Sequence, residues 1–346
     1  MYLPKTYTVE SVTSGHPDKV CDQISDAILD ALLAQDPMSR VAVETFGGHD
    51  LLVIGGEVTS TAKVDYEKIA RAVYKDIGYD DKNLKVIVHV VQQSPDIAMG
   101  VDTGGAGDQG IMYGYATNET PELLPRAIVL VHKLAYGLEK LRRSKKLPWL
   151  RPDGKTQISV HNGKITSVLV STQHDEKISQ EQLRADLIKH LIKPIIGKLD
   201  GIEVLTNPTG LFVQGGFSAD TGLTGRKIMV DTYCGLAPHG GGAFSGKDAT
   251  KVDRSAAYMC RFVARWLVKK RHAKQALVSV SYAIGRAEPL MVEAINEKGK
   301  SLADIVKKNF DFKPKSIIEK LGLRKPIFQQ TAAYGHFGKK GVSWER

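Results

Sequence analysis

Apolar side chains recur along this chain at two spacings, one typical of helices and one typical of strands. In residues 15–36 the apolar positions Val20, Ile24, Ile28 and Leu32 are four apart, which predicts a helix with one buried face. Similar patterns predict helices over residues 65–77, 121–141, 180–193, 252–270, 302–310 and 315–321, and strands over residues 41–46, 51–58, 84–91, 157–161, 164–172, 202–205, 211–214, 228–232, 276–283 and 290–295.

The order of these elements predicts the fold class. Strands are mixed with one or two helices in groups of roughly 100 residues, the usual size of a domain. The segments at residues 47–50 and 162–163 have the turn chemistry of hairpins, so several neighbouring strands are antiparallel. The pattern therefore favours an α+β fold of two or three similar units, each a sheet backed by helices on one face, over a doubly wound parallel sheet.

A second stripe on the first helix is acidic. Asp18, Asp22, Asp26 and Asp30 are also four apart, and like charges at this spacing repel one another in an isolated helix. We therefore expect most of the stripe to be solvated. Asp18 differs because it lies in the first helical turn beside His16, where a metal or a phosphate can approach the helix N-terminus. His16 itself is interpreted either as a helix cap or as a functional residue.

Two glycine-rich segments resemble nucleotide-binding loops without matching them. Gly241, Gly246 and Lys247 have the spacing of a P-loop, but Asp248 stands where that motif needs a hydroxyl, and no strand precedes the loop. Residues 105–110 read GxGxxG, again without the strand and helix that a dinucleotide fold requires. The five glycines of residues 92–110 instead predict a long lid or binding loop.

Composition narrows the function classes. The chain has 346 residues, and its 48 basic and 38 acidic side chains give a net charge of +10, which suits a polyanionic partner, either a nucleotide or a nucleic acid. Its three cysteines lack a CxxC spacing, so neither a disulfide framework nor a zinc site is indicated. Because no apolar run reaches the length of a membrane span and no signal pattern opens the chain, we expect a cytoplasmic protein without a membrane partner.

Three separate glycine-rich turns place cations beside carboxylates. Together they supply five basic side chains, more than a small carboxylate needs and suited to a triphosphate bound with a divalent metal. Asp18, Asp108 and Asp253 are candidate magnesium ligands, because magnesium is bound by a few carboxylates together with phosphates and water. The turns contain Asp153 and Lys155; Asp220, Arg226 and Lys227; and Lys247, Asp248 and Lys251.

Several long strings in this chain resemble the S-adenosylmethionine synthetase (methionine adenosyltransferase) family. They are ESVTSGHPDK at residues 10–19, GDQGIMYGYATNET at 107–120, GLTGRKIMVDTY at 222–233, GGGAFSGKD at 240–248 and AAYGHFG at 332–338. The resemblance runs nearly from end to end. It implies that ATP and L-methionine give S-adenosylmethionine, after which the enzyme-bound triphosphate is hydrolysed to pyrophosphate and phosphate.

The resemblance also implies roles for individual residues. His16 would stabilise the oxygen that leaves C5′, with Lys155, Arg226 and Lys247 as further catalytic groups. Lys227 would join these in holding the phosphates. The other ATP-binding residues would be Asp108, Asp153, Phe212, Asp220 and Ala243; methionine would be bound by Glu57, Gln93, Asp220, Lys251 and Ile284; two Mg²⁺ ions would be held by Asp18 and Asp253, and K⁺ by Glu44.

The architecture implied by the resemblance is three similar domains about a pseudo-threefold axis. We place these domains at residues 1–100, 101–213 and 214–346, and expect a homodimer with shared active sites, or a homotetramer. Phe217 and Ala219 stand where proline and glycine are common in the family, and the lid segment at residues 101–107 is shorter than in many bacterial members of the family. The alternatives are another ATP-dependent phosphotransferase, or a nucleic-acid-binding protein using the basic runs at 142–146 and 265–274, which have little aromatic interleaving for base stacking and no recognised binding motif.

Overall fold

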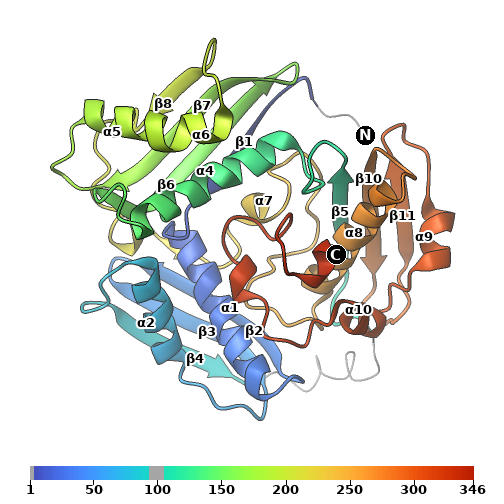
Figure 1. Ribbon diagram of the computed structural model, residues 1–346. Coiled ribbons are helices and arrows are strands. Elements are labelled where there is room, and N and C mark those ends of the chain that lie inside the picture. The colour runs from blue at the N-terminus through green and yellow to red at the C-terminus, as the bar shows by residue number, and fades with distance from the viewer. Residues whose placement is uncertain (1–3, 93–104) are drawn as a thin grey trace.

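The computed structural model describes residues 4–92 and 105–346, which form three sheet-and-helix units around a common centre (Figure 1). The predicted loop over residues 92–110 lies mostly outside the described residues, as does Gln93. In the part of the chain that is described, no helix is both long and apolar enough to cross a membrane.

The first unit has a four-stranded sheet in the order β4-β3-β2-β9. Strands β2 and β3 are antiparallel, whereas β3 and β4 are parallel, so the sheet is mixed. Helix α1 packs on β2 and on α2. The elements are α1 (Pro17–Gln35), β2 (Arg40–Gly48), β3 (Leu51–Thr59), α2 (Tyr66–Ile77), β4 (Lys85–Val91) and β9 (Gly222–Leu223).

The second unit has a mixed sheet in the order β1-β6-β7-β8, with α4 packed on β6. Strands β7 and β8 are its parallel pair. The helix predicted over residues 180–193 is a continuous helical segment that includes one π turn at Ile188–Ile192. The elements are β1 (Thr6–Val12), α4 (Arg126–Arg143), β6 (Leu150–His161), β7 (Lys164–His174), α5 (Gln180–Leu187), α6 (Lys193–Ile196) and β8 (Glu203–Thr206).

The third unit has an antiparallel sheet in the order β11-β10-β5, and α8 packs closely on β5. Gly114 permits this contact, because a Cβ atom at that position would lie 2.1 Å from the backbone nitrogen of Arg261. The elements are β5 (Gly110–Thr117), α7 (Ile228–Asp231), α8 (Val252–Lys269), β10 (Gln275–Tyr282), β11 (Met291–Asn296), α9 (Ala303–Asn309) and α10 (Pro314–Leu321). The α+β class and the three units are thus confirmed.

Each sheet contains a strand from a distant part of the chain. β1 is an edge of the second sheet through its pairing with β6, β5 pairs with β10 in the third, and β9 pairs with β2 in the first. The boundaries at residues 1–100, 101–213 and 214–346 stay a prediction, and none of the three segments builds a whole sheet without the others.

The prediction of a solvated acidic stripe on α1 was wrong. Asp18, Asp22 and Asp26 are at most 1 % exposed, because α1 lies toward the centre of the molecule and is buried on two faces (Figure 1). Each carboxylate accepts a backbone N–H from another segment, which satisfies its hydrogen-bonding capacity without water. The donors are Leu223 for Asp18, Gly225 for Asp22, Gly246 for Asp26, and Phe328 and Gln329 for Asp30. The apolar stripe is confirmed, since Val20, Ile24, Ile28 and Leu32 are fully buried.

Three local predictions were also wrong. Residues 228–232 contain the short helix α7 in place of a strand, and its Asp231 accepts a hydrogen bond from the buried Lys19. Residues 211–214 are not a strand, because the His174 imidazole takes the Phe212 N–H that a sheet ladder would use. The turn expected around Asp153 is instead the start of β6, where the register with β7 shifts between Leu150 and Gly154.

Candidate active site

The N-terminal end of α1 begins where β1 leaves the second sheet. Thr13 donates through its N–H to the Gly154 carbonyl at 2.9 Å and through its hydroxyl to the Pro152 carbonyl at 2.7 Å. Gly15 then passes so close to β6 that a Cβ atom would lie 2.4 Å from the Pro152 carbonyl carbon, so only glycine fits. This packing brings His16 within electrostatic reach of Lys155.

His16 is the N-cap residue of α1. Its Nδ1 accepts the Asp18 N–H at 3.2 Å, so the proton of a neutral ring belongs on Nε2. Burial, followed by the charges of Lys227, Lys155, Lys19 and Arg226, lowers the pKa of His16 to about 2. The imidazole is therefore neutral, with Nε2–H as a hydrogen-bond donor.

The loop at residues 222–227 closes over this helix end. Lys227 Nζ lies 2.5 Å from one Asp18 carboxylate oxygen, and Arg226 Nε lies 3.4 Å from the other. A Cβ atom on Gly222 would lie 2.2 Å from the Pro17 carbonyl carbon, which explains a glycine at this contact. Asp18 thus stands between two cations at the positive end of a helix, an arrangement suited to phosphate and metal together.

The glycine loop at residues 239–247 supplies the next cation. Lys247 Nζ lies 2.6 Å from an Asp253 carboxylate oxygen, and its backbone forms a β-bridge with Ala42 of β2. Gly246, at a φ of +80°, passes so near β2 that a Cβ atom would lie 1.9 Å from the Val43 carbonyl oxygen. The loop is therefore seated on the first sheet with Lys247 held beside a carboxylate.

Asp248, the residue that breaks the P-loop pattern, has a structural role. Its carboxylate accepts the Val41 N–H at 2.7 Å and pairs with Lys251 at 2.7 Å. Burial alone would raise the pKa of Asp248, but Lys251 and the backbone donors bring it below its usual value. Lys251 and Lys247 consequently have different carboxylate partners.

The two loops meet along α1 and β2. A Cβ atom on Gly225 would lie 2.4 Å from the Ala243 side chain, and the Thr224 hydroxyl contacts those of Ser25 and Thr45. Among the described residues, no group of three or more His, Cys, Asp or Glu side chains forms a ready metal site. Two carboxylates that each stand beside a lysine suit Mg²⁺ that arrives with phosphates and water.

The first sheet brings further predicted residues to the same face. Ala42 lies opposite both Glu57 and Lys247, and directly opposed residues of antiparallel strands share a face. Glu44, two residues from Ala42 on β2, is on that face too. Glu44, Glu57 and Lys247 therefore lie along the face that turns away from α1.

Asp153 and Asp220 are close enough for their charges to interact. Asp153 is 5 % exposed and accepts the Gly216 N–H at 2.9 Å. Burial raises its pKa to about 6, against the effect of backbone donors and Lys155. Asp220 is exposed, and its carboxylate accepts the Thr221 N–H.

Other predicted residues contact different segments. Phe212 is hydrogen bonded to His174 beside β7. Asp108 precedes β5, and Ile284 follows β10 and is 62 % exposed. Tyr282 pairs with Gly110, and the Gly285 N–H donates to the Ala106 carbonyl. Asp108 and Ile284 therefore lie at the same end of the third sheet.

Sequence reasoning missed two residues that support the site. The Asp26 carboxylate accepts the Gly246 N–H and forms a two-pronged ion pair with Arg254, at 2.6 and 2.8 Å. Arg254 also donates to the Phe244 and Lys247 carbonyls, so the pair holds the Lys247 loop from inside. The acidic stripe was the available signal, but it was interpreted as surface.

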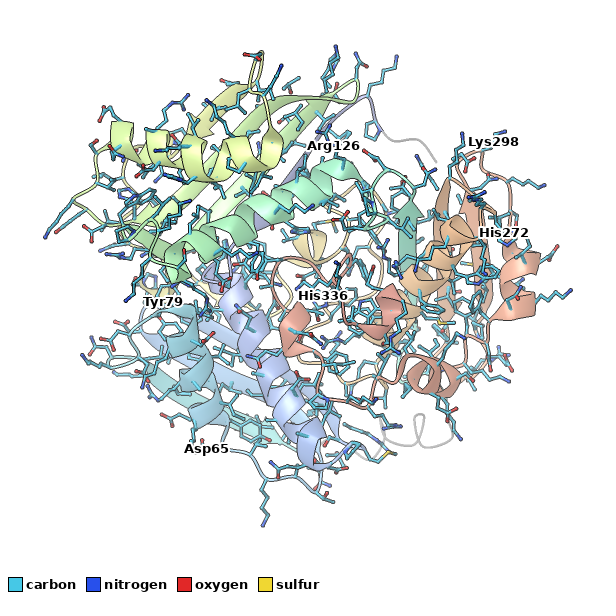
Figure 2. All side chains as sticks on the ribbon, viewed as in Figure 1. Asp65, Tyr79, Arg126, His272, Lys298 and His336 are labelled. Carbon is cyan, nitrogen blue, oxygen red and sulfur yellow. The ribbon has the colours of Figure 1, made fainter. Side chains whose placement is uncertain are left out.

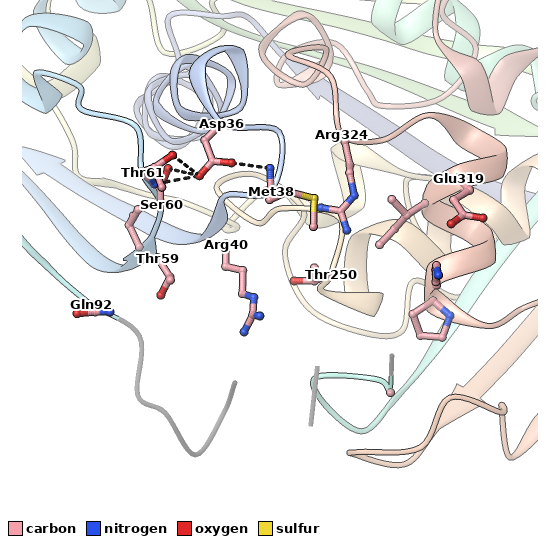
Figure 3. Close-up of a pocket in the computed structure, with 15 residues that line it drawn as sticks. Asp36, Met38, Arg40, Thr59, Ser60, Thr61, Gln92, Thr250, Glu319 and Arg324 are labelled. Atoms are coloured by element: carbon pink, nitrogen blue, oxygen red, sulfur yellow. Dashed lines mark hydrogen bonds between the residues drawn. The ribbon is translucent and has the colours of Figure 1, made fainter. Parts of the chain in front are cut away.

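Two large cavities lie away from these clusters. One, of about 880 Å³, lies between Arg40 and Thr59 of the first unit and Glu319 and Arg324 of the third, with Asp36 hydrogen bonded to Thr61 at its edge (Figure 3). The other, of about 780 Å³, lies between α4 and residues 329–340. The cationic clusters line neither cavity.

Comparison with known proteins identifies the family. Three domain models match in order: S-adenosylmethionine synthetase, N-terminal domain at residues 4–95, central domain at 103–212 and C-terminal domain at 214–346. Proteins named S-adenosylmethionine synthase are similar over nearly their whole length. The Mesoplasma florum protein is 51 % identical, and the match covers 99 % of this chain and 98 % of the relative. The Pseudothermotoga lettingae protein is 50 % identical, with 99 % of this chain and 96 % of the relative covered. The Petrotoga mobilis protein is 48 % identical, with 98 % of this chain and 96 % of the relative covered. With conserved domain order along essentially all of its length, the chain belongs to the S-adenosylmethionine synthetase family.

Proposed function

We propose that the residues gathered at the N-terminus of α1 and on the Lys247 loop carry out the family's reaction. In that reaction the methionine sulfur attacks C5′ of ATP, S-adenosylmethionine forms, and the triphosphate leaves and is then hydrolysed to pyrophosphate and phosphate. The observation that carries the assignment is a pair of cationic clusters on two loops that contact each other at Gly225 and Ala243. Lys155, Arg226 and Lys227 surround His16 and Asp18, and Lys247 stands beside Asp253.

The chemistry explains this composition. A thioether sulfur is neutral and polarizable, so it attacks without a general base, and the barrier lies in aligning it with C5′ and stabilising the departing triphosphate. Lys155, Arg226, Lys227 and Lys247 supply positive charge for that leaving group. The Nε2–H of His16 donates to the oxygen that leaves C5′, because Nδ1 is already occupied by the Asp18 N–H.

Metal ions complete the charge balance. Asp18 and Asp253 would hold two Mg²⁺ ions, which would supply positive charge against the phosphate oxygens. Lys227 and Lys247, which pair with these carboxylates, would be available to the phosphates. Glu44 would hold K⁺ on the open face of the first sheet. The support for this assignment is the oxygen donor chemistry of the three carboxylates.

The substrates bind across this face. Asp108, Asp153, Phe212, Asp220 and Ala243 complete the ATP site around the cations. Glu57, Asp220 and Lys251 bind the polar ends of methionine, and Ile284 binds its apolar part. Gln93, which lies outside the described residues, completes the methionine site.

The active site is shared between two subunits of a homodimer. Ile87 and Val91 of β4 and Phe46 of β2 are 40–53 % exposed, and they lie beside Glu44 and Glu57. Apolar side chains at this density on a sheet face are typical of an interface.

Incubation with ATP, methionine, Mg²⁺ and K⁺ tests the function, with S-adenosylmethionine, pyrophosphate and phosphate measured together. His16→Ala and Lys247→Ala are each expected to lower the synthesis rate about 10²- to 10³-fold, the usual cost of losing one stabilising group for transition-state charge. Near-normal synthesis in either variant would refute that residue's role.

A second experiment tests the shared site. Ile87→Lys places a charge on the apolar face and is expected to give monomers, detected by sedimentation. These monomers should lack synthesis activity in the assay above. Met38→Lys, at a residue that is 63 % exposed outside this face, is the control. Active monomers of the Ile87 variant would exclude a shared site.

A further inference from the structure

The segment that ends at His16 is held by side chains from several parts of the chain. The Ser14 carbonyl accepts the Gln23 side-chain amide at 2.7 Å, and the Gly15 carbonyl accepts the Tyr79 hydroxyl at 2.7 Å. Tyr79 follows α2 and lies near the start of α1 (Figure 2). These two bonds fix the carbonyl side of the segment to the first unit.

The other polar groups of Ser14 are fixed by the second and third units. Its N–H donates to the Tyr334 hydroxyl at 3.0 Å, and its own hydroxyl donates to Glu139 Oε2 at 3.1 Å. The Tyr334 hydroxyl is hydrogen bonded to the same Glu139 oxygen. Ser14, Tyr334 and Glu139 thus form a closed triangle of hydrogen bonds.

The direction of each bond in the triangle follows from its donors. Because the Tyr334 oxygen accepts from Ser14, its proton goes to Glu139. Burial, and then the Glu139 charge, raises the pKa of Tyr334 far above its usual value, so the phenol keeps this proton. Glu139 is oriented in turn by Arg143, whose Nε donates to it at 2.6 Å.

The backbone of Tyr334 supports a specific role for its hydroxyl. Its φ is +61°, in the left-handed region that a tyrosine rarely adopts, and Gly335 follows with a φ of +78°. The ring packs against Tyr136 of α4, with ring centres 5.2 Å apart. The chain therefore adopts an unfavourable conformation where it presents this phenol to Ser14.

We propose that Tyr334 and Glu139 are positioning residues for His16, acting through Ser14. His16 has its own bond to the Asp18 N–H, which orients the ring, whereas the triangle sets where the preceding backbone lies. Losing the triangle displaces the Nε2–H from the oxygen that leaves C5′. This inference rests on the role of His16 proposed above.

Tyr334→Phe tests the proposal, because it removes the hydroxyl and keeps the ring. We expect kcat for S-adenosylmethionine synthesis to fall about 10- to 100-fold, since small displacements of a catalytic group cost about this much. KM values for ATP and methionine should change less than about threefold. Hydrolysis of added tripolyphosphate, which breaks no C5′–O bond, should stay within about threefold of the wild-type rate. Tyr136→Phe makes the same change on the neighbouring ring and should leave both steps unchanged.

Glu139→Gln is the second variant, because it keeps the shape of the side chain but removes the charge that accepts from both hydroxyls. It should give the same selective loss of synthesis, and combining it with Tyr334→Phe should add little, since both changes break one triangle. Equal loss of synthesis and hydrolysis, or no loss, overturns the proposal. Failure of both variants to fold, judged by thermal unfolding, also overturns it, because the triangle would then be structural.

His16→Ala separates this inference from the proposed function. If His16→Ala lowers synthesis selectively and Tyr334→Phe does not, the positioning role is wrong and the role of His16 stands. If His16→Ala itself has no selective effect, the role of His16 fails, and the positioning role fails with it.

Discussion

Asp26 and Arg254 form an ion pair whose removal should affect both stability and activity. Both side chains are completely buried, and the pair joins α1 to the loop that carries Lys247. Arg254 also donates to the Tyr258 hydroxyl and packs over the Phe328 ring, 4.1 Å from its centre. Asp26→Asn keeps the shape of the acid and removes its charge, so the guanidinium is left buried without a counter-ion.

The expected loss of unfolding free energy is about 3–5 kcal/mol, the usual cost of breaking a buried pair by removing one partner. Arg254→Met should cost a similar amount, because it leaves the buried Asp26 carboxylate without its counter-ion and removes the guanidinium donor from the Phe244 and Lys247 carbonyls. The double variant should cost at least about 2 kcal/mol less than the sum of the two, since it leaves no unpaired charge.

Urea unfolding at one fixed protein concentration measures these values, because the stability of the proposed dimer would depend on concentration. Asp76→Asn is the matched control: Asp76 pairs with Arg143 at 2.9 Å but is 75 % exposed, so its loss should cost less than about 1 kcal/mol. Synthesis should also fall in Asp26→Asn, as the Lys247 loop loses its support. A cost as small as the control's, or strictly additive single variants, would refute the reasoning.

Three further outcomes are expected. Burial, and then Lys19, lowers the pKa of Lys339 to about 7 against Asp231 and Glu139, so the unfolded chain binds more protons above this pH. The unfolding free energy should therefore rise by at most about 3 kcal/mol between pH 7 and 9, as measured by urea titrations. Lys339→Met should abolish this rise. Lys340→Met, at an exposed lysine, is the control and should keep it. Gly114→Ala should cost more than about 3 kcal/mol or prevent soluble expression, because the new methyl group meets the α8 backbone; a normal melting temperature would contradict this. EDTA should abolish synthesis and excess Mg²⁺ should restore it, while Glu44→Gln should reduce only activation by K⁺; synthesis that persists in EDTA would exclude the metal roles.

The buried acidic stripe explains how one helix organises the site. Asp18, Asp22 and Asp26 each bind a different point on the two glycine-rich loops. The bonded loop residues lie more than 200 positions from these aspartates in the chain, yet they are aligned by one helical row at a spacing of four residues. Both loops are thereby attached to the same side of α1.

The amino-acid sequence alone determined the local elements with strong periodicity and the chemistry of the loops. The four-residue spacing of Val20, Ile24, Ile28 and Leu32 is a property of the helix itself, so it predicted the buried face of α1. The long strings around His16 and Lys247 carry the family resemblance, because they are unusual and occur in order.

Only the tertiary structure decided what surrounds those elements. The sequence could not show that the stripe at Asp22 and Asp26 is buried, because its partners Gly225 and Gly246 are distant in the chain. It could not show that β1 completes the second sheet, since pairing with β6 is a long-range contact. Residues 228–232 have the apolar composition of a strand, but the structure has a short helix there, in which Asp231 forms an ion pair with the buried Lys19. The burial of a side chain and the pairing of a strand depend on distant parts of the fold, so the local spacing of residues cannot predict them.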